Sequence, residues 1–253
     1  MNQAKISVFL VTLNEAERIA EVIHSVSCFD EVIVVDSGST DGTPEIARDL
    51  GATVYLRDWL GYAKQKALAA DLCANDWLLN IDGDEVMTEP LAQELKALAS
   101  REDIAGVRIP INDFMLDHPL HRLSRKRKIV RMFRRNLATY PVDRSVHENL
   151  DVKGIVINAE SELHHFGYNR PKVYFAKHIK YAELRACDKR RAGKRGSVIK
   201  LLLAFPFTFT KVLFFRGMIF SGYRGLLVTT AESMYALLKE AFLIRLTYSQ
   251  SND

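Results

Sequence analysis

Acidic side chains gather directly after one apolar stretch of the chain. Residues 77–85 read WLLNIDGDE, so that Asp82, Asp84 and Glu85 follow a run with the character of a buried strand. Mg²⁺ and Mn²⁺ prefer hard oxygen ligands of this kind, usually one or two carboxylates completed by substrate phosphates and water. We therefore predict that Asp84 and Asp82 bind such a cation together with the diphosphate of an activated substrate. Gly83 leaves room for the ligand to approach the backbone.

A second polar turn, VVDSGSTDGT at residues 34–43, follows an earlier apolar run. Asp36 is placed there to accept hydrogen bonds from a base or a ribose. Asp-Gly pairs are also common in surface turns, but two acidic turns that each follow a buried strand favour a ligand site. Neither GxGxxG nor GxxxxGK[ST] occurs, so the sequence does not support a dinucleotide-binding or P-loop protein.

Two lysines, Lys64 and Lys66, lie near the start of a predicted helix over residues 62–73. The N-terminus of a helix attracts anions through its backbone N–H groups and its dipole. Either lysine is therefore a candidate to contact the diphosphate. The alternative is a solvated helix face, which needs no ligand.

Strands and helices that alternate over the first hundred residues would position these side chains. Apolar, β-branched runs predict buried strands at residues 6–13, 31–36, 52–56 and 76–81. Helices are expected to begin at Asn14, with Glu17 completing a capping box, at Thr43-Pro44, near residue 62 and at Thr88.

This alternation predicts an α/β fold, a Rossmann-like, mostly parallel sheet flanked by helices. Ligands of such sheets bind at the carboxyl ends of the strands. The polar residues expected at those ends are Thr12, Asn14, Asp36, Asp41, Asp82 and Asp84.

The pattern changes after residue 103. Further strands, joined by polar, charged loops, are expected at 106–113, 128–135 and 152–158. They would extend the sheet and line the side of the site that binds the second substrate, the acceptor. A basic helix is expected over 171–192. We divide the chain into a catalytic domain, residues 1–168, and a basic, apolar, amphipathic helical appendage, residues 169–253.

The net charge of +4 conceals a strong asymmetry along the 253 residues. Residues 1–118 carry 9 Lys/Arg and 21 Asp/Glu, whereas residues 119–253 carry 26 and 10. An acidic half that binds cations and a basic half that faces anions is the simplest interpretation. The three cysteines are widely spaced, which argues against a disulfide framework and for a reducing compartment.

Residues 198–247 are very apolar, but charged side chains interrupt the segment, among them Lys200, Lys211, Arg216, Arg224 and Glu232. No charge-free stretch reaches the ~18–20 residues that a spanning helix needs, so we expect helices that lie on a membrane surface. The eleven Lys/Arg of residues 170–200 would be drawn to anionic headgroups. The alternative is a helical appendage that packs on the catalytic domain or on another subunit.

Candidate acceptor-side residues come from the second half of the chain. In RSVHEN, residues 144–149, Glu148 can serve as general base for an attacking hydroxyl, and His147 can do so instead or orient the acceptor. An ordinary surface glutamate is the alternative. Arg131 and Arg134 lie in a stretch with eight Lys/Arg, residues 121–135, which suits either a nucleic acid or an acceptor that bears phosphates.

Two adjacent histidines, His164 and His165, complete the set of candidates. Neighbours on a strand point to opposite faces, so at most one is expected to enter the site, where it could bind the metal or a phosphate. A structural, hydrogen-bonded histidine is the alternative.

Together, VTLNE (11–15), VVDSGSTDGT (34–43), the Lys64/Lys66 helix, DWLLNIDGDE (76–85) and VHENL (146–150) resemble the family-2 glycosyltransferases of the GT-A fold. Within that family the chain looks most like the lipopolysaccharide core β-1,4-glucosyltransferases of Gram-negative bacteria. The resemblance implies inverting transfer from a nucleotide sugar, with UDP-glucose as the expected donor and Mg²⁺ or Mn²⁺ as cofactor. It also implies that Thr12, Glu15 and Asp36 lie near the nucleotide, and that Glu148 is the base.

We therefore expect a glycosyltransferase that associates peripherally with the cytoplasmic face of the inner membrane and acts on an anionic, lipid-linked saccharide such as a heptose of the lipopolysaccharide inner core. Transfer to a polyprenyl phosphate is the close alternative. A metal-dependent phosphohydrolase and a nucleic-acid-binding protein are less favoured. Acidic strand ends would repel the phosphates of a nucleic acid unless a cation lay between them. The sequence leaves the oligomeric state open.

Overall fold

The computed structural model describes residues 4–141, 150–168 and 171–248. It divides the chain into two compact units, one formed by Met1–Asn112 and Lys126–His165 and the other by Asp113–Arg125 and Phe166–Asp253. The sequence predicted a boundary close to residue 168. It did not predict that the segment 113–125 belongs with the C-terminal helices.

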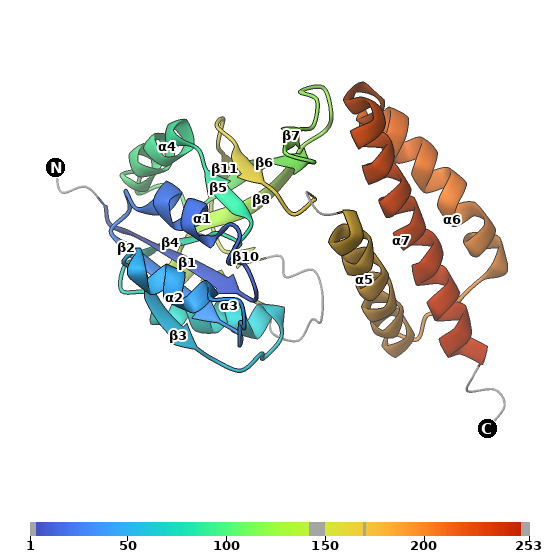
Figure 1. The fold of residues 1–253 in the computed structure, drawn as a ribbon, viewed down its shortest axis with the longest axis horizontal. Helices are drawn as coiled ribbons and strands as arrows, with labels where there is room; N and C mark the ends of the chain where they lie inside the picture. Colours follow the sequence, from blue (N-terminus) through green and yellow to red (C-terminus); the bar gives the residue numbers. More distant parts are fainter. Residues whose placement is uncertain (1–3, 142–149, 169–170, 249–253) are drawn as a thin grey trace. The chain divides into compact units, whose positions relative to one another are not determined.

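The first unit contains the expected run of parallel strands (Figure 1). These strands lie in the order β3-β2-β1-β4 and are β1 (Ile6–Thr12), β2 (Glu31–Asp36), β3 (Thr53–Leu56) and β4 (Trp77–Asn80). Helices connect them in the order α1 (Ile19–Val26), α2 (Thr43–Asp49) and α3 (Tyr62–Leu72). The predicted α/β architecture with a mostly parallel sheet is therefore confirmed for this part of the chain.

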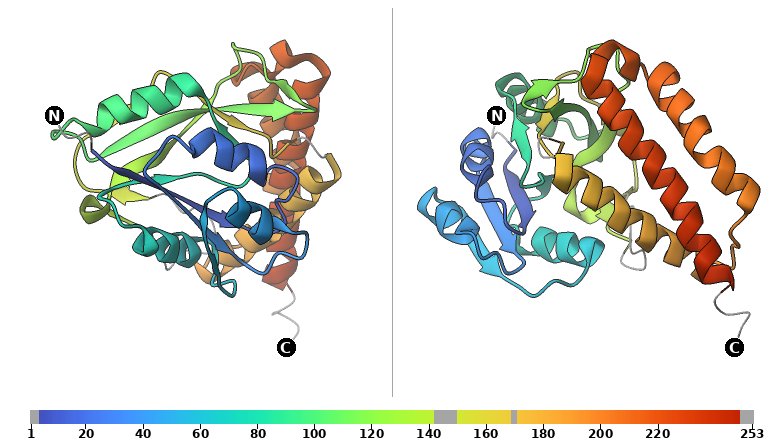
Figure 2. Two further views of the ribbon diagram at one scale, coloured as in Figure 1. Left: turned by 60° about the vertical axis from the view of Figure 1, so that its left-hand side comes forward. Right: turned by 45° about the vertical axis from the view of Figure 1, so that its right-hand side comes forward.

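Antiparallel strands extend the sheet beyond β4 (Figure 2). β8 pairs with β4 and with β6, and the short strands β12 and β5 pair with each other. The bounds are β5 (Glu85–Met87), β6 (Gly106–Met115), β8 (Arg127–Arg134) and β12 (Leu163–His165). β11 (Val156–Asn158) pairs with β6 in parallel. A separate two-stranded ribbon joins β9 (Ala138–Thr139) to β10 (Asp151–Val152), and β7 (His118–Pro119) pairs with the end of β6.

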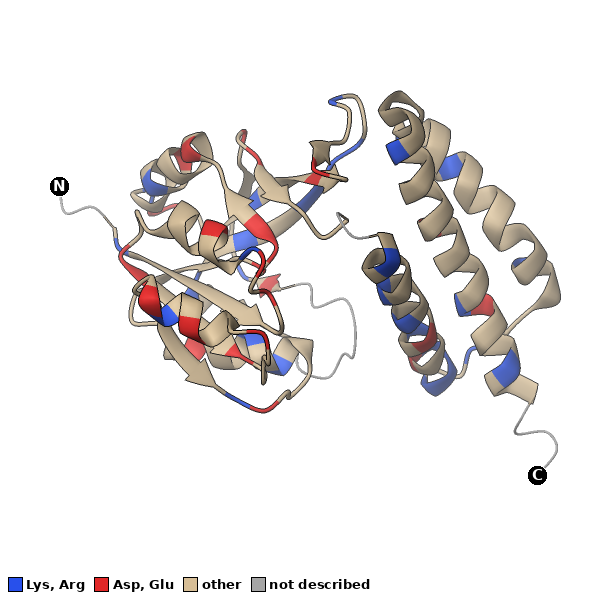
Figure 3. Cartoon of the chain, in the orientation of Figure 1, with Lys and Arg blue, Asp and Glu red and all other residues tan. Residues whose placement is uncertain are grey.

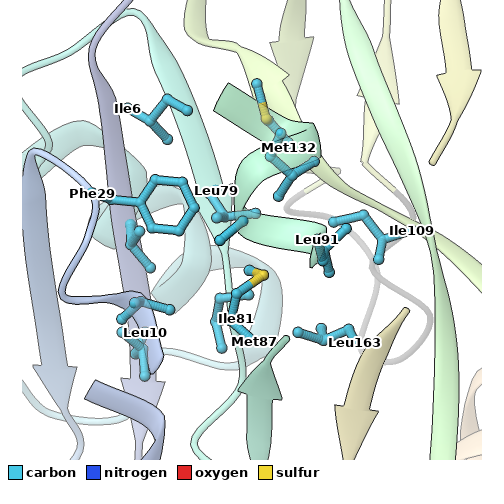
Figure 4. Packing of buried hydrophobic residues seen from close by; sticks show 14 of the residues in the cluster. Ile6, Leu10, Phe29, Leu79, Ile81, Met87, Leu91, Ile109, Met132 and Leu163 are labelled. Atoms are coloured by element: carbon cyan, nitrogen blue, oxygen red, sulfur yellow. The ribbon is translucent and has the colours of Figure 1, made fainter. Parts of the chain in front are cut away.

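Alternating side chains of the strands build a core on each face of the sheet. Val8 and Leu10 of β1 pack with apolar residues of α1, α2 and α4 (Glu89–Ala99) (Figure 4). Phe9, between them, points to the other face and packs with residues of α3 and with Phe133. Burial on both faces holds the strands in one register, because a slip of one residue would exchange the two sets of side chains.

The second unit is helical. It consists of α5 (Pro171–Arg191), α6 (Val198–Thr210), a π-helical turn η2 (Lys211–Phe215), a 3-10 turn η3 (Met218–Ser221) and α7 (Gly222–Tyr248). α7 packs against both α5 and α6 and lies between them in Figures 1 and 2. Gly225 permits the tight turn into α7, because a Cβ there would lie 1.8 Å from the carbonyl oxygen of Met218.

One local prediction was wrong. α1 begins at Ile19 rather than at Asn14, whose φ of 59° places it in the left-handed region. Within the described part of the chain, Val198–Phe215 forms one helical stretch with the length and the mean hydropathy, 1.8, of a helix able to cross a membrane. The stretch includes Lys200 and Lys211, and the expectation that these helices lie on a membrane surface stays a prediction.

Candidate active site at the carboxyl ends of the parallel strands

The loops after β1 and β2 are fastened to each other by hydrogen bonds. The carboxamide oxygen of Asn14 accepts a bond of 2.9 Å from the backbone N–H of Thr40, and the Asn14 N–H donates to Ser39 Oγ at 2.7 Å. These bonds use Asn14 to hold the neighbouring loop, which is why it does not cap α1. The two polar turns predicted from the sequence therefore form one structure.

Asp36 is the buried anchor of this structure. One carboxylate oxygen accepts from the N–H groups of Gly38 and Ser39, and the other accepts from the hydroxyl of Thr12 at 2.8 Å. Asp36 and Thr12 are 0% and 1% exposed. Both lie at the strand ends, as expected, but here they shape the loop beside which a nucleotide would bind. Contact of Asp36 with a base or ribose stays a prediction.

The acidic turn after β4 contains a buried cluster of opposite charges. Lys66 of α3 lies 3.0 Å from one oxygen of Asp82, and Arg131 of β8 donates to the other at 2.7 Å. Arg131 also donates to Asn80 at 2.9 Å and forms an ion pair with Glu85. Arg131 and Glu85 are almost fully enclosed, whereas Asp82 is about one-third exposed.

These contacts set the protonation of the two carboxyls in opposite directions. Burial alone would raise the pKa of Asp82, but the charges of Arg131 and Lys66 outweigh it and hold that pKa well below its ordinary value. Burial and the neighbouring charge of Asp82 raise the pKa of Glu85 despite the ion pair with Arg131. Asp82 is therefore a permanent anion at neutral pH that holds Lys66 at the strand end.

Asp84 projects from the same turn toward a histidine. Its Oδ2 lies 3.5 Å from Nε2 of His165, which β12 brings next to β5 by pairing His165 with Glu85. Of the two adjacent histidines, His165 is therefore the one that lies beside the acidic turn. The pairing of β5 with β12 joins residues about eighty positions apart.

The residues present fit a divalent cation bound mainly by its substrate. Among the residues that the structure describes, no group of three or more His, Cys, Asp or Glu side chains is arranged to hold a metal ion. Asp84 supplies a carboxylate oxygen, and His165 orients it. Arg127 lies 3.3 Å from Nδ1 of His165 and can only donate, so Nε2 of His165 bears the proton that faces Asp84. Mg²⁺ and Mn²⁺ commonly take few protein ligands and complete their shell with phosphates and water. Asp82, with its oxygens facing Lys66 and Arg131, fits a supporting role better than that of a ligand.

Gly83 fits closely against the first loop. A Cβ at this position would lie 2.7 Å from Cγ of Glu15, and the Glu15 N–H donates to Thr43 Oγ1 at 2.9 Å. The sequence predicted that glycine here permits a close approach. The approaching group in the structure is Glu15, a candidate nucleotide-binding residue, so the acidic turn and the nucleotide loops touch.

The other predicted site residues lie in three places. Lys64 is exposed on α3, two residues before Lys66 and on a different face of the helix. Arg134 lies opposite Trp77 at the amino end of β4, where it stacks over that ring and donates to the carbonyls of Ile104 and Arg101. His147 and Glu148 lie outside the described residues.

Two arginines predicted to bind the acceptor thus have other partners. Arg131 is enclosed by Asn80, Asp82 and Glu85, and Arg134 is at the wrong end of the strand to meet a ligand beside Asp84. Neither arginine is part of the acceptor site proposed below. Sequence reasoning also missed Gln65, fully buried on α3, whose carboxamide accepts from the Leu60 N–H and donates to Ser37 Oγ. A glutamine between two lysines gave no signal for this role.

Several known proteins resemble this chain in sequence or in fold. The chain is 32% identical to the lipopolysaccharide core biosynthesis glycosyltransferase LpsC of Rhizobium meliloti, over 93% of this chain and 90% of that protein. It is 34% identical to an uncharacterized glycosyltransferase of Rickettsia felis, over 87% and 83%. The fold is similar to that of glucosyl-3-phosphoglycerate synthase from Mycobacterium tuberculosis, with a TM-score of 0.50, 22% identity and coverage of 77% of this chain and 82% of that chain.

Residues 7–147 match the model of glycosyl transferase family 2. This match contains both fastened loops, the α3 lysine and the acidic turn, and it covers more than half of the chain. The chain therefore belongs to glycosyl transferase family 2, with a GT-A-like fold, and is a nucleotide-sugar-dependent glycosyltransferase.

Proposed function

We propose that the chain is an inverting hexosyltransferase that moves glucose from UDP-glucose onto a heptose of the lipopolysaccharide inner core. The observation that carries the donor half of this proposal is the acidic turn, in which Asp84 and His165 face each other beside the Lys66–Asp82 pair. The alignment with the Rhizobium protein covers nearly the whole chain, and that protein is named as a lipopolysaccharide core biosynthesis glycosyltransferase, which supports such a role here.

In this proposal Asp84, oriented by His165, would hold Mg²⁺ or Mn²⁺ together with the donor diphosphate. The cation, when bound, neutralises charge that develops on the departing nucleotide diphosphate. Lys66 adds a second positive charge at the same strand end, and Asp82 fixes its position. The loop held by Asn14 and Asp36 binds the nucleoside, with Glu15 between that loop and Gly83.

The acceptor half of the proposal rests on residues outside the described part of the chain. Glu148 takes the proton of the attacking hydroxyl, which displaces the nucleotide diphosphate from the opposite face of the sugar and inverts the anomeric centre. His147 orients the acceptor. The acceptor is anionic and lipid-linked, and the chain meets it at the cytoplasmic face of the inner membrane. Transfer to a polyprenyl phosphate is the second candidate, because that acceptor is also anionic and lies in a membrane.

A transfer assay with the purified full-length chain tests the proposal. UDP-glucose, UDP-galactose and GDP-mannose are each offered with a heptose-terminated core lipid or with a polyprenyl phosphate. We expect glucose transfer to the core lipid only, and a loss of at least about 100-fold in kcat for Asp84→Asn.

Asp103→Asn is the matched control, since that carboxylate is exposed and pairs with Arg101 on the surface. It is expected to keep wild-type activity. Transfer to the polyprenyl phosphate would replace the proposed acceptor with the second candidate. Equal turnover in the two variants would reject the role of Asp84.

A further inference from the structure

Within the second unit, α6 and the turn η2 that follows it expose an unusual amount of apolar surface. Along α6 and η2 the exposed side chains include Leu202, Leu203, Phe207 and Phe215, with exposed fractions of 69%, 59%, 70% and 81%. Only 6% of the stretch Val198–Phe215 is buried. Contiguous apolar surface of this kind marks a site that is covered by a partner or a membrane.

The charge around this surface identifies what covers it. Between Asp188 and Glu232 the chain has nine Lys/Arg and no Asp or Glu. Lys194, Arg195, Lys200 and Lys211 are exposed beside or within the apolar stretch, and Figure 3 shows Lys and Arg along α5 as well. A second copy of the chain would bring this positive surface against itself, whereas anionic lipid headgroups neutralise it.

Contacts at both ends of the stretch formed by α6 and η2 hold this stretch against α7. At its start, the Ser197 N–H donates to the buried carboxylate of Glu240 at 3.0 Å, and the Gly196 N–H donates to Thr247 Oγ1 at 3.1 Å. At the far end, Arg216 forms an ion pair with Glu232. α6 therefore cannot cross a membrane without taking α7 with it.

This pairing excludes a spanning arrangement. α7 carries charged residues over its whole length, and these would have to enter the hydrocarbon with α6. They are Arg224, Glu232, Lys239, Glu240 and Arg245.

We propose that α6 and η2 lie in the plane of an anionic bilayer, with their exposed apolar face among the upper acyl chains and α7 on the water side. Lys200 and Lys211, near the two ends of the stretch, extend to the headgroups. This inference deepens the peripheral membrane association proposed above and rests on it. It identifies the element that inserts and its orientation.

Flotation with vesicles of phosphatidylglycerol and phosphatidylethanolamine tests the insertion. The full chain is expected to bind these vesicles and to bind neutral phosphatidylcholine vesicles far less. Leu202→Gln/Phe207→Gln should weaken binding by at least about 30-fold, because two large side chains lose their burial. Leu56→Gln/Ile155→Gln is the matched control, since those side chains are 55% and 58% exposed on the first unit. It should bind as the wild type does.

A labelling experiment tests the orientation. One variant, Lys194→Cys, places a thiol four residues before α6, and another, Lys211→Cys, places a thiol at the first residue of η2. Each variant also carries Cys28→Ser and Cys187→Ser. An impermeant maleimide outside sealed vesicles should label both positions. Protection of either position from the outside reagent, with labelling from inside, would show a spanning helix and overturn the proposal.

The remaining outcomes also decide the question. Undiminished vesicle binding by Leu202→Gln/Phe207→Gln would reject α6 as the inserting element. A lipid-free dimer that the same substitutions dissociate would identify a second copy as the occupant. Calorimetric binding of UDP-glucose in solution is measured on every variant. A wild type that binds UDP-glucose but not the anionic vesicles would overturn this inference and leave the proposed donor binding intact, whereas vesicle binding without UDP-glucose binding would do the reverse.

Discussion

Arg131 places a positive charge inside the acidic turn of this glycosyltransferase. It bonds to Asn80 and Asp82 and pairs with Glu85, and its side chain is 6% exposed. Removal of one member of a buried ion pair leaves an uncompensated charge, which is far more costly than the net contribution of the intact pair. Arg131 therefore positions the turn that carries Asp84.

Arg131→Met is expected to lower the free energy of unfolding by about 3–5 kcal/mol. Urea denaturation followed by circular dichroism measures this. The double variant Arg131→Met/Glu85→Gln should be more stable than Arg131→Met alone, since the amide needs no counterion. Equal stability of the two variants would contradict the proposed coupling between Arg131 and Glu85.

Gly83 is predicted to be sensitive to a single methyl group. In Gly83→Ala the added Cβ meets Glu15 Cγ at 2.7 Å, and such overpacking costs about 1–3 kcal/mol. The displaced Glu15 should weaken UDP-glucose binding, which calorimetry measures. In a Glu15→Ala background the same substitution should cost less stability. An equal cost in both backgrounds would show that Glu15 is not the obstacle.

At the scale of elements, periodicity predicted the strands and helices well where burial decides them. β1, β2, α3 and α4 lie within one or two residues of the expected ranges, and Thr88 caps α4 as predicted. The start of α1 was misplaced because Asn14 and Ser39 bond across two loops. That interaction depends on parallel pairing of β1 with β2, which local sequence does not encode.

The pair α5–α7 contains a histidine that should make the helical unit sensitive to acid. His178 packs against the rings of Tyr174 and Tyr235, at centroid distances of 4.3 and 6.1 Å. Burial lowers its pKa below the ordinary value of 6.5 although a backbone hydrogen bond to Tyr174 opposes this. The unfolded chain therefore binds more protons near and below that pH, and the free energy of unfolding should fall as the pH drops through 6.5.

Thermal unfolding at pH 8 and pH 5.5 checks this expectation. His178→Gln keeps a hydrogen-bond donor without a titrating ring, so its melting temperature should fall less between the two pH values than that of the wild type. His24→Gln is the control, because His24 is an exposed histidine near the end of α1. An equal fall in wild type and His178→Gln would exclude His178 as the source.

At the scale of the whole molecule, the sequence predicted which polar residues gather at the strand ends but not the contacts among them. Asp82, Asp84 and Lys66 were expected there because strand ends and helix starts are visible in the pattern of residues. Arg131 was assigned to the acceptor because its partners come from β4 and β5, which it reaches only through antiparallel pairing of β8 with β4. Segment 113–125 was misplaced for a similar reason, since its partners lie about a hundred residues away.

Calorimetric titration of the wild type and Asp84→Asn with UDP-glucose, in Mn²⁺ and in chelator, tests the central claim most directly. If a divalent cation at Asp84 binds the donor diphosphate, the wild type should bind at least about 10-fold more tightly with Mn²⁺ than in chelator. Asp84→Asn should bind with nearly the same, weak affinity in both. Equally tight binding of the wild type with and without the cation would contradict the account.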